Sequence, residues 1–269
     1  MNNQRLRAAI YGLAVGDALG LPVQFRSRGS FHITSMTGFG TYNQPEGTWS
    51  DDTSMTLATC DSIRRLDGKV DPDDIFQAFE RWYYDGTYTP FGHSFDVGNG
   101  TSLAIQQKKG QSDFYSNGNG SLMRILPLAF TKADDNLIEE VSALTHAHTI
   151  SRQACVIYIQ IARALLEGRP YSLDHPEPYQ RLKKLRSLNE EEIKSSGYVV
   201  DSLEAALWCL LTTKSYTDCI LKAVNLGDDT DSIAAIAGGL AGITYGFDSI
   251  PVEWIKALQA KEVIENCLF

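Results

Sequence analysis

The chain has 269 residues, of which 43% are hydrophobic and 21% are charged, so a large core is expected and disorder is not. Its formal net charge of -9 argues against nucleic acid or an anionic membrane as the main partner. Five scattered cysteines without a C-x-x-C pair favour a reducing cytoplasmic location over a disulfide framework.

The first 23 residues predict a packed helix rather than a signal peptide. Leu6, Ile10 and Leu13 fall on one helical face, and Asp17 interrupts the apolar stretch. Counted as uninterrupted apolar residues, no run in the chain approaches the roughly 18 needed for a membrane span, so we expect no contact with a membrane.

Glycine recurs every four residues in two apolar stretches, at positions 12, 16 and 20 and again at 238, 242 and 246. An interior helical glycine costs about 1 kcal/mol relative to alanine. Residues four apart share a helix face, so the stripes predict that each helix approaches another helix closely, and these two helices are candidates for each other. Coincidence in a glycine-rich chain is the alternative.

Helical patterns dominate the middle of the chain. Asp71 as a cap and Pro72 at the first position predict a helix over residues 71–86. Residues 149–168 predict a long buried helix that ends at Gly168. Asp201 and Glu204 have the spacing of a capping box at the start of the next apolar helix.

The rest of the chain adds little strand signal. Pro251 opens a segment that predicts one or two closing helices, and residues 31–36 are the best strand candidate. Glycine-rich stretches at 36–48, 86–101 and 110–121 are interpreted as ordered loops, not as domain linkers. We therefore predict a single all-α domain that spans residues 1–269.

Two acidic stretches each precede an apolar helix. Capping would explain one carboxylate in each, but adjacent carboxylates repel, and their burial requires a raised pKa or a cation. The carboxylates and the flanking hydroxyls are Ser50, Asp51, Asp52, Asp229, Asp231 and Ser232. Neither stretch contains Cys or His, so a pair of Mg²⁺ or Mn²⁺ ions fits better than zinc. Such a pair would activate water and polarise the bond being cleaved.

Other residues could surround this centre. The loop "SNGNGS" offers backbone N–H groups at positions 118–121 to an oxyanion, although Asn-Gly pairs also make ordinary turns. Arg124 lies in an apolar run and must find an anion, either a core carboxylate or a ligand. His146 could simply bond backbone at a helix junction, and Asp96 could form an Asx-turn.

The chain resembles the ADP-ribosylglycohydrolases, most of all the bacterial branch typified by dinitrogenase reductase-activating glycohydrolase. Seven stretches carry the resemblance, in the family's order: "GLAVGDALGLPVQF", "WSDDTSM", "FDVGNGT", "GNGSLMRILPL", "LTHAHTISRQAC", "SGYVVDSL" and "NLGDDTDSIAAIAGGLAGITYGFDSIP". The resemblance implies an all-α fold around two divalent cations. The implied activity is the removal of ADP-ribose from a modified protein side chain, most similar to hydrolysis of ADP-ribosyl-arginine.

The resemblance also implies roles for individual residues. It assigns metal ligands to Ser50, Asp51 and Asp52 and to Asp229, Asp231 and Ser232. Catalytic roles fall on Asp51, Asp52 and Asp96, the last beside the ribose. Contacts to ADP-ribose fall on Ser116, Asn117, Gly118, Asn119, Gly120, His146 and Tyr198.

One position departs from the family pattern. Gln24 stands where the family often has a glutamate beside the metals, so it keeps an oxygen but loses a charge. An ADP-ribose-binding or structural protein with a weakened catalytic site therefore stays as the alternative to an active hydrolase. A metal hydrolase acting on a phosphoester is the third hypothesis, which the acidic pairs alone would permit.

Overall fold

The computed structural model describes residues 2–269, which form α-helices joined by loops and short 3-10 turns. The helices are α1 (Asn2–Gly20), α2 (Asp51–Arg65), α3 (Pro72–Asp85), α4 (Asn99–Gln107), α5 (Asp135–Ala143), α6 (Thr149–Glu167), α7 (Val199–Thr212), α8 (Tyr216–Val224), α9 (Thr230–Tyr245), α10 (Val252–Ala257) and α11 (Lys261–Cys267). Over these residues the only β-type pairing is three isolated bridges. The all-α prediction is confirmed, and the strand candidate at 31–36 was wrong.

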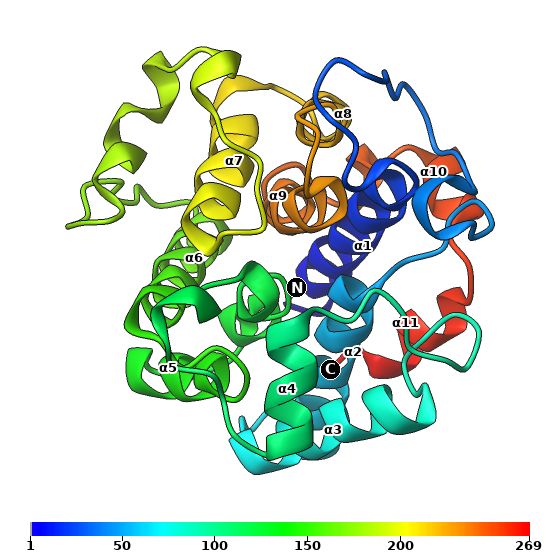
Figure 1. Cartoon of the computed structure of the whole chain (residues 1–269), viewed down its shortest axis with the longest axis vertical. Helices are drawn as coiled ribbons and strands as arrows, with labels where there is room; N and C mark the ends of the chain where they lie inside the picture. Colours follow the sequence, from blue (N-terminus) through cyan, green and yellow to red (C-terminus); the bar gives the residue numbers. More distant parts are fainter. Residues whose placement is uncertain (1) are drawn as a thin grey trace.

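Helices α1 and α9 lie side by side at the centre of the fold, with α7 and α8 next to α9 (Figure 1). A Cβ on Gly12 would lie 2.4 Å from the carbonyl oxygen of Gly238, and one on Gly16 would lie 2.1 Å from that of Ala234. Because no side chain fits between the two backbones, the predicted close approach of the two stretches is confirmed.

The glycine stripe on α9 is shorter than the sequence suggested. Gly238 and Gly242 face α1, where an added Cβ would lie 2.2 Å from a backbone oxygen in each case. Gly246 instead follows the last residue of α9 with a φ of 85°, and nothing lies within 4 Å of its missing Cβ. It ends the helix rather than packing against α1.

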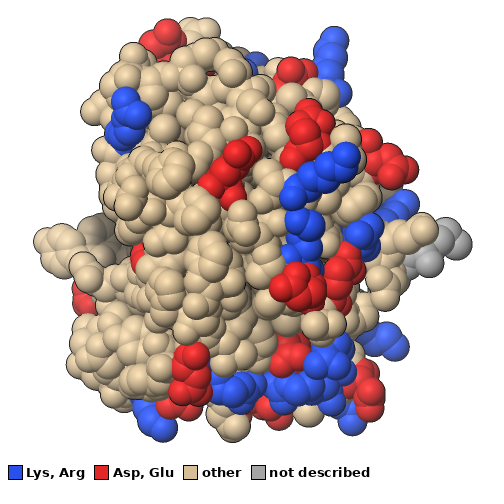
Figure 2. All heavy atoms as spheres, turned by 90° about the vertical axis from the view of Figure 1, so that its right-hand side faces the viewer, with Lys and Arg blue, Asp and Glu red and all other residues tan. Residues whose placement is uncertain are grey.

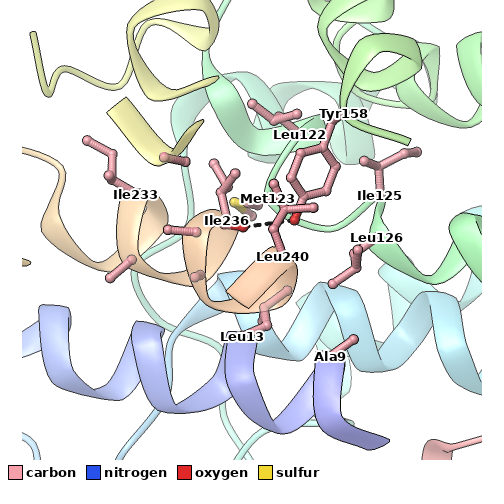
Figure 3. Packing of buried hydrophobic residues seen from close by; sticks show 14 of the residues in the cluster. Ala9, Leu13, Leu122, Met123, Ile125, Leu126, Tyr158, Ile233, Ile236 and Leu240 are labelled. Carbon is pink, nitrogen blue, oxygen red and sulfur yellow. Dashed lines mark hydrogen bonds between the residues drawn. The ribbon is translucent and has the colours of Figure 1, made fainter. Parts of the chain in front are cut away.

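A continuous apolar core surrounds this helix pair (Figure 3). Leu126 of the segment before α5 packs against α9 at Gly239, where an added Cβ would lie 2.4 Å from Cδ2 of Leu126, and Leu126, Ile236 and Leu240 are fully buried. The hydroxyl of Tyr158 on α6 donates to the carbonyl oxygen of Ile236 across 2.9 Å, so this buried polar group is satisfied. The core therefore fixes α9 against α6 as well as α1.

Two of the three predicted helix boundaries are confirmed. The Asp71 side chain accepts hydrogen bonds from the first turn of α3, and Gly168 ends α6 in the left-handed conformation. The capping box at the start of α7 was wrong, since that helix begins at Val199. Asp201 accepts instead from the hydroxyl of Ser196, and Glu204 pairs with Arg181.

The expectation that no segment has the length of a membrane span needs correction. Residues Asn3–Val23 form a helical segment that is long and apolar enough to cross a membrane by length and composition. This segment is 94% buried inside the fold. Its apolar character is therefore accounted for by packing against α9 and α2.

Charged side chains are unevenly distributed over the face shown in Figure 2. Basic and acidic residues alternate along one side and along the lower rim, while a broad area carries few charges. Because the two signs are interspersed, this face does not present a continuous basic surface of the kind that binds nucleic acid.

Candidate functional site

Three buried carboxylates meet where α1, α2 and α9 converge. The close approach of α1 and α9 continues to Gly20, whose missing Cβ would lie 2.4 Å from the backbone nitrogen of Asp231. Asp17, Asp52 and Asp231 are at most 1% exposed, and each offers an oxygen within 4.8 Å of the others. The glycine stripe thus places an aspartate of α1 beside the first turns of the two other helices.

The first turn of α2 is held by Asp17 and Ser50. Both carboxylate oxygens of Asp17 accept from the backbone nitrogen of Ser50 at 3.0 Å, and Thr53 donates to Asp17 through its backbone nitrogen and its hydroxyl. Ser50 caps the helix, since its Oγ accepts from the backbone nitrogen of Asp52. Asp51 and Asp52 are therefore not the caps.

The start of α9 is arranged differently. Asp229 occupies the N-cap position, but its side chain makes no capping hydrogen bond and accepts instead from Nδ2 of Asn119 at 2.5 Å. Asp228 is exposed, with a left-handed φ of 58°. The sequence left Asp228 without a ligand role, and its position on the surface agrees with that omission.

Burial is the main influence on the carboxyl groups of this cluster. It raises the pKa of Asp51, Asp52 and Asp231 well above the usual range, and neighbouring carboxylates raise them further. The pKa of Asp17 and that of Asp229 rise to about 6 for the same first reason. Proton uptake or a bound cation is needed to relieve this concentration of charge.

Several oxygens of the cluster are left without hydrogen bonds. Oδ1 of Asp52, Oδ2 of Asp231, Oδ2 of Asp96 and Oε1 of Gln24 are buried and have no partner among residues 2–269. An unpaired buried acceptor costs about 1–3 kcal/mol. All the free atoms are hard oxygens, so the residues fit Mg²⁺ or Mn²⁺ as the sequence predicted.

A cavity of about 250 Å³ opens against this cluster. Gln24, Asp51, Asp96, Asp229 and Ser232 line its acidic side. The rest of the lining includes His146, Thr101 and glycines from the start of α4 and from the loop of residues 116–121; these glycines are Gly98, Gly100, Gly118 and Gly120. Asp17, Asp52 and Asp231 do not line the cavity and lie behind the acidic wall.

Asp96 and Gln24 both line the cavity beside the acidic cluster. The hydroxyl of Tyr42 donates to Oδ1 of Asp96, and the pKa of Asp96 is raised mainly by burial. The amide of Gln24 makes a small contribution that lowers the pKa of both Asp96 and Asp229, so it lies close to both carboxyl groups. Gln24 therefore places a neutral amide beside these two carboxyl groups.

The loop of residues 116–121 contributes in two ways. Gly118 and Gly120 face the cavity, whereas the side chains of Asn117 and Asn119 hold the loop by bonding Ser151, Ser202 and Asp229. The backbone nitrogen of Asn119 already donates to the carbonyl oxygen of Gly197, so it is not free for an oxyanion. Ser116 lies outside the cavity lining, and its hydroxyl donates to Asp113.

A second cavity of about 520 Å³ adjoins the first and shares Gly118 and Gly197 with it. Its walls are mainly aromatic, from Phe114, Tyr115 and Tyr198. Tyr198 thus lines the second cavity and His146 lines the first, with the shared residues Gly118 and Gly197 between the two cavities. The residues that sequence reasoning assigned to the site all lie in the cluster, the cavities or the loop of residues 116–121, but Ser116 lines neither cavity and bonds Asp113 instead.

Asp17 was missed as a site residue. A signal for it was present, because one acidic residue interrupts an otherwise apolar helical stretch. Without the packing of α1 on α9, that residue could not be placed beside Asp52 and Asp231. Tyr42 was missed for a similar reason, since its contact with Asp96 spans 54 positions of the chain.

The fold and the site together define an all-α protein with a buried oxygen-rich centre beside a cavity that continues into an aromatic pocket. The family description of ADP-ribosylglycohydrolases matches residues 2–268. The chain is 34% identical to the ADP-ribosylarginine hydrolase Tri1 of Serratia proteamaculans, over 97% of this chain and 77% of that protein. It is 32% identical to the ADP-ribosyl-[dinitrogen reductase] glycohydrolase of Rhodospirillum rubrum, over 96% and 92% of the two chains.

A solved structure described as an ADP-ribosylglycohydrolase-related protein complex matches with a TM-score of 0.80 and 29% identity, over 99% of this chain and 96% of that chain. The chain belongs to the ADP-ribosylglycohydrolase family. The resemblance inferred from the seven sequence stretches is therefore confirmed, and removal of ADP-ribose is the activity that this family membership supports.

Proposed function

We propose that this protein hydrolyses the N-glycosidic bond between ADP-ribose and an arginine side chain of a modified protein, with two divalent cations, Mg²⁺ or Mn²⁺, as cofactors. The observation that carries the proposal is the set of buried, unpartnered carboxylate oxygens on Asp52, Asp96 and Asp231, of which Asp96 lines the cavity and the other two lie in the buried cluster beside it. Two relatives are named for action on ADP-ribosylated targets, one of them on ADP-ribosylarginine. A cytoplasmic location fits the five free, buried cysteines.

Asp51, Asp52, Asp229 and Asp231 would hold the cations, with Ser50 and Ser232 as further oxygen donors. When bound, divalent cations polarise a reacting oxygen and lower the pKa of a water molecule. Asp96 is placed to exchange a proton with a ribose hydroxyl, because its Oδ2 is unpartnered at the cavity and Tyr42 fixes its Oδ1. Asn119 holds Asp229 in position.

The two adjoining cavities suit the shape of ADP-ribose. The glycine wall of the first lets a ribose and diphosphate approach the backbone, and the aromatic walls of the second suit stacking on a flat adenine ring. Gly118, which lines both, would lie along the link between the two parts of the ligand. The residues proposed to contact ADP-ribose are thus Gly118, Gly120, His146 and Tyr198, with Asn117 and Asn119 supporting the loop.

An arginine linkage fits the neutral side chain of Gln24. When the bond to the ribose breaks, a protonated guanidinium leaves as a neutral guanidine and needs no strong general acid. A serine oxygen would leave as an alkoxide, so its departure gains more from an added acidic group. The test compares release of ADP-ribose from arginine-linked and serine-linked peptides by one enzyme batch, with and without EDTA.

We expect faster release from the arginine-linked peptide, loss of activity after chelation, and recovery with Mg²⁺ or Mn²⁺. Faster release from the serine-linked peptide would refute the linkage, and full activity without metal would refute the cofactor assignment. Tight binding of ADP-ribose without release from either peptide would support the binding-protein alternative, which the replacement of glutamate by Gln24 favours.

A further inference from the structure

Arg124 is a buried cation without a counter-ion. Its side chain is 0% exposed, and it forms no ion pair with any described residue. Nη2 donates to the carbonyl oxygen of Val141 at 3.2 Å and to Oγ1 of Thr145 at 2.8 Å, while Nε and Nη1 have no partner. The guanidinium also lies 4.4 Å from the centre of the Phe79 ring. Of the two anions that the sequence allowed, a core carboxylate is therefore excluded.

A hydrogen-bonded chain leads from Arg124 to the first cavity. Oγ1 of Thr145 lies 2.9 Å from Nδ1 of His146, and His146 lines the cavity. The other ring nitrogen, Nε2, lies against Gly100, Gly118 and Gly120, where an added Cβ would be 3.3 to 3.4 Å away. Within residues 2–269 no hydrogen bond is made to Nε2. The imidazole therefore spans the distance between the buried cation and the cavity.

The direction of the hydrogen bonds follows from the chemistry of the groups. A guanidinium only donates, so Oγ1 of Thr145 accepts from Arg124. The hydroxyl proton of Thr145 then needs an acceptor, and Nδ1 of His146 is the remaining neighbour. If Nδ1 carried a proton, the buried hydroxyl would be left without an acceptor, which is unfavourable for a buried polar group.

We infer that Arg124 and Thr145 are positioning residues that hold His146 as a neutral imidazole with its proton on Nε2, aimed at an anionic oxygen of the ligand in the first cavity. The inference rests on the proposed function, because it assigns the phosphate side of ADP-ribose to this wall. The part of the lining formed by glycines and His146 would then bind anionic oxygen, and the charge of Arg124 would be balanced only when the ligand is bound.

The surroundings of His146 support a neutral ring. Burial lowers its pKa to about 3, and the nearby charge of Arg124 contributes in the same direction. A positively charged imidazole is therefore not available at neutral pH. The Nε2–H group of a neutral His146, with the buried charge of Arg124 nearby, attracts an anion without adding a second buried positive charge.

The first measurement is the protonation of His146 in the free protein, by nitrogen-15 NMR of histidine-labelled enzyme at pH 7. The His146→Gln variant identifies the signal among the five histidines. We expect a proton on Nε2 and an unprotonated, hydrogen-bonded Nδ1, unchanged between pH 5 and 8. A proton on Nδ1, or a charged ring, would overturn the inference whether or not the enzyme is active.

The second measurement is binding of ADP-ribose by calorimetry to Thr145→Val and Thr145→Ser. The valine variant should bind about tenfold more weakly, the loss of roughly one net hydrogen bond, and should lose the Nδ1 signature. The serine variant keeps the hydroxyl and should bind within about twofold of the unaltered protein. A valine variant with a lower melting temperature but unchanged affinity and NMR signature would show a structural role only.

Arg124→Met tests the charge. Replacing an uncompensated buried cation by an apolar side chain should leave the melting temperature unchanged or raise it, while ADP-ribose binding weakens by about tenfold. Unchanged binding by this variant would overturn the role of Arg124. If the unaltered protein binds no ADP-ribose, the proposed function fails, whereas the NMR result in free protein still decides the state of His146.

Discussion

The hydroxyl of Ser232 donates to Oδ2 of Asp52 across 3.1 Å and joins two residues that are 180 positions apart in the chain. The hydroxyl of Ser50 donates to the same oxygen at 3.2 Å. Because two hydroxyls hold Oδ2, the rotation of the carboxylate is fixed and Oδ1 is the oxygen left free. The first turns of α2 and α9 thus act as one rigid unit, which is the property that a precise cation site requires.

Asp231→Asn tests whether the cluster binds metal or only stabilises helix ends. The substitution removes one charge from a buried, repelling group, so the metal-free protein should be as stable as the unaltered one or more stable. Activity should fall by more than about 100-fold, since loss of an outer-shell contact alone costs about 10- to 100-fold. The measurements are turnover of an arginine-linked peptide and thermal unfolding. Asp228→Asn is the matched control, because Asp228 is exposed and should keep full activity.

A different result would contradict metal binding: much of the Asp231→Asn protein is unfolded, but the fraction that stays folded has normal activity. The carboxylate would then stabilise the start of α9 and would not bind a cation.

Asp17→Asn should behave differently from Asp231→Asn. The carboxylate of Asp17 accepts from Ser50 and Thr53, whereas an asparagine offers only one accepting atom to these donors. We expect a loss of about 1–3 kcal/mol in unfolding free energy. A fall of about 10- to 100-fold in Mn²⁺ affinity should accompany it, because α2 no longer presents Asp52 in one position. Calorimetry and denaturant unfolding measure the two effects, and unchanged stability would disprove the anchoring role.

Gly16→Ala tests the contact between α1 and α9. Helix propensity alone would favour alanine by about 1 kcal/mol. The added Cβ would, however, lie 2.1 Å from the carbonyl oxygen of Ala234, so backbone must move. Such overpacking costs about 1–3 kcal/mol, and we expect net destabilisation in thermal unfolding. A more stable Gly16→Ala protein would mean that the two helices separate easily.

The sequence predicted helices and their chemistry better than their arrangement. Asp51, Asp52, Asp229 and Asp231 were found because adjacent carboxylates before apolar helices have few structural uses. The glycine stripes predicted a close approach, but the inclusion of Gly246 could be corrected only from the conformation at the end of α9. The local pattern at Asp201 also gave a wrong prediction, because it placed the start of the helix at that residue. Helix α7 begins at Val199 instead, directly after Tyr198, which forms a backbone bridge with Gly118.

Protonation of Asp229 should compete with metal. Burial raises its pKa to about 6, above the usual 3.8, although the hydrogen bond from Asn119 opposes this. Because the folded pKa exceeds the unfolded one, the stability linked to this proton is complete below pH 3.8 and is lost as pH rises through about 6. In metal-free samples, the melting temperature of the unaltered protein relative to Asp229→Asn should therefore fall between pH 4 and 7. Saturating Mg²⁺ should remove that fall, since the cation replaces the proton. A difference that rises with pH in metal-free protein would contradict this account.

Gln24→Glu tests the departure from the family pattern. The amide of Gln24 lies close to Asp96 and Asp229 and lowers the pKa of both carboxyl groups. A glutamate there would repel them, so the metal-free variant should melt at a lower temperature at pH 8. A cation would gain an additional anionic neighbour, and we expect Mn²⁺ to bind at least about tenfold more tightly, or about 1.4 kcal/mol.

Gln24→Leu, which lacks both amide and charge, separates hydrogen bonding from electrostatics in the same calorimetric assay. It should bind Mn²⁺ no more tightly than the unaltered protein. Faster cleavage of serine-linked peptide by Gln24→Glu would tie this position to the choice of leaving group. Equal Mn²⁺ affinity of Gln24→Glu and the unaltered protein would show that the charge of residue 24 does not act on the cations. The neutral side chain would then not explain a preference for arginine-linked over serine-linked ADP-ribose.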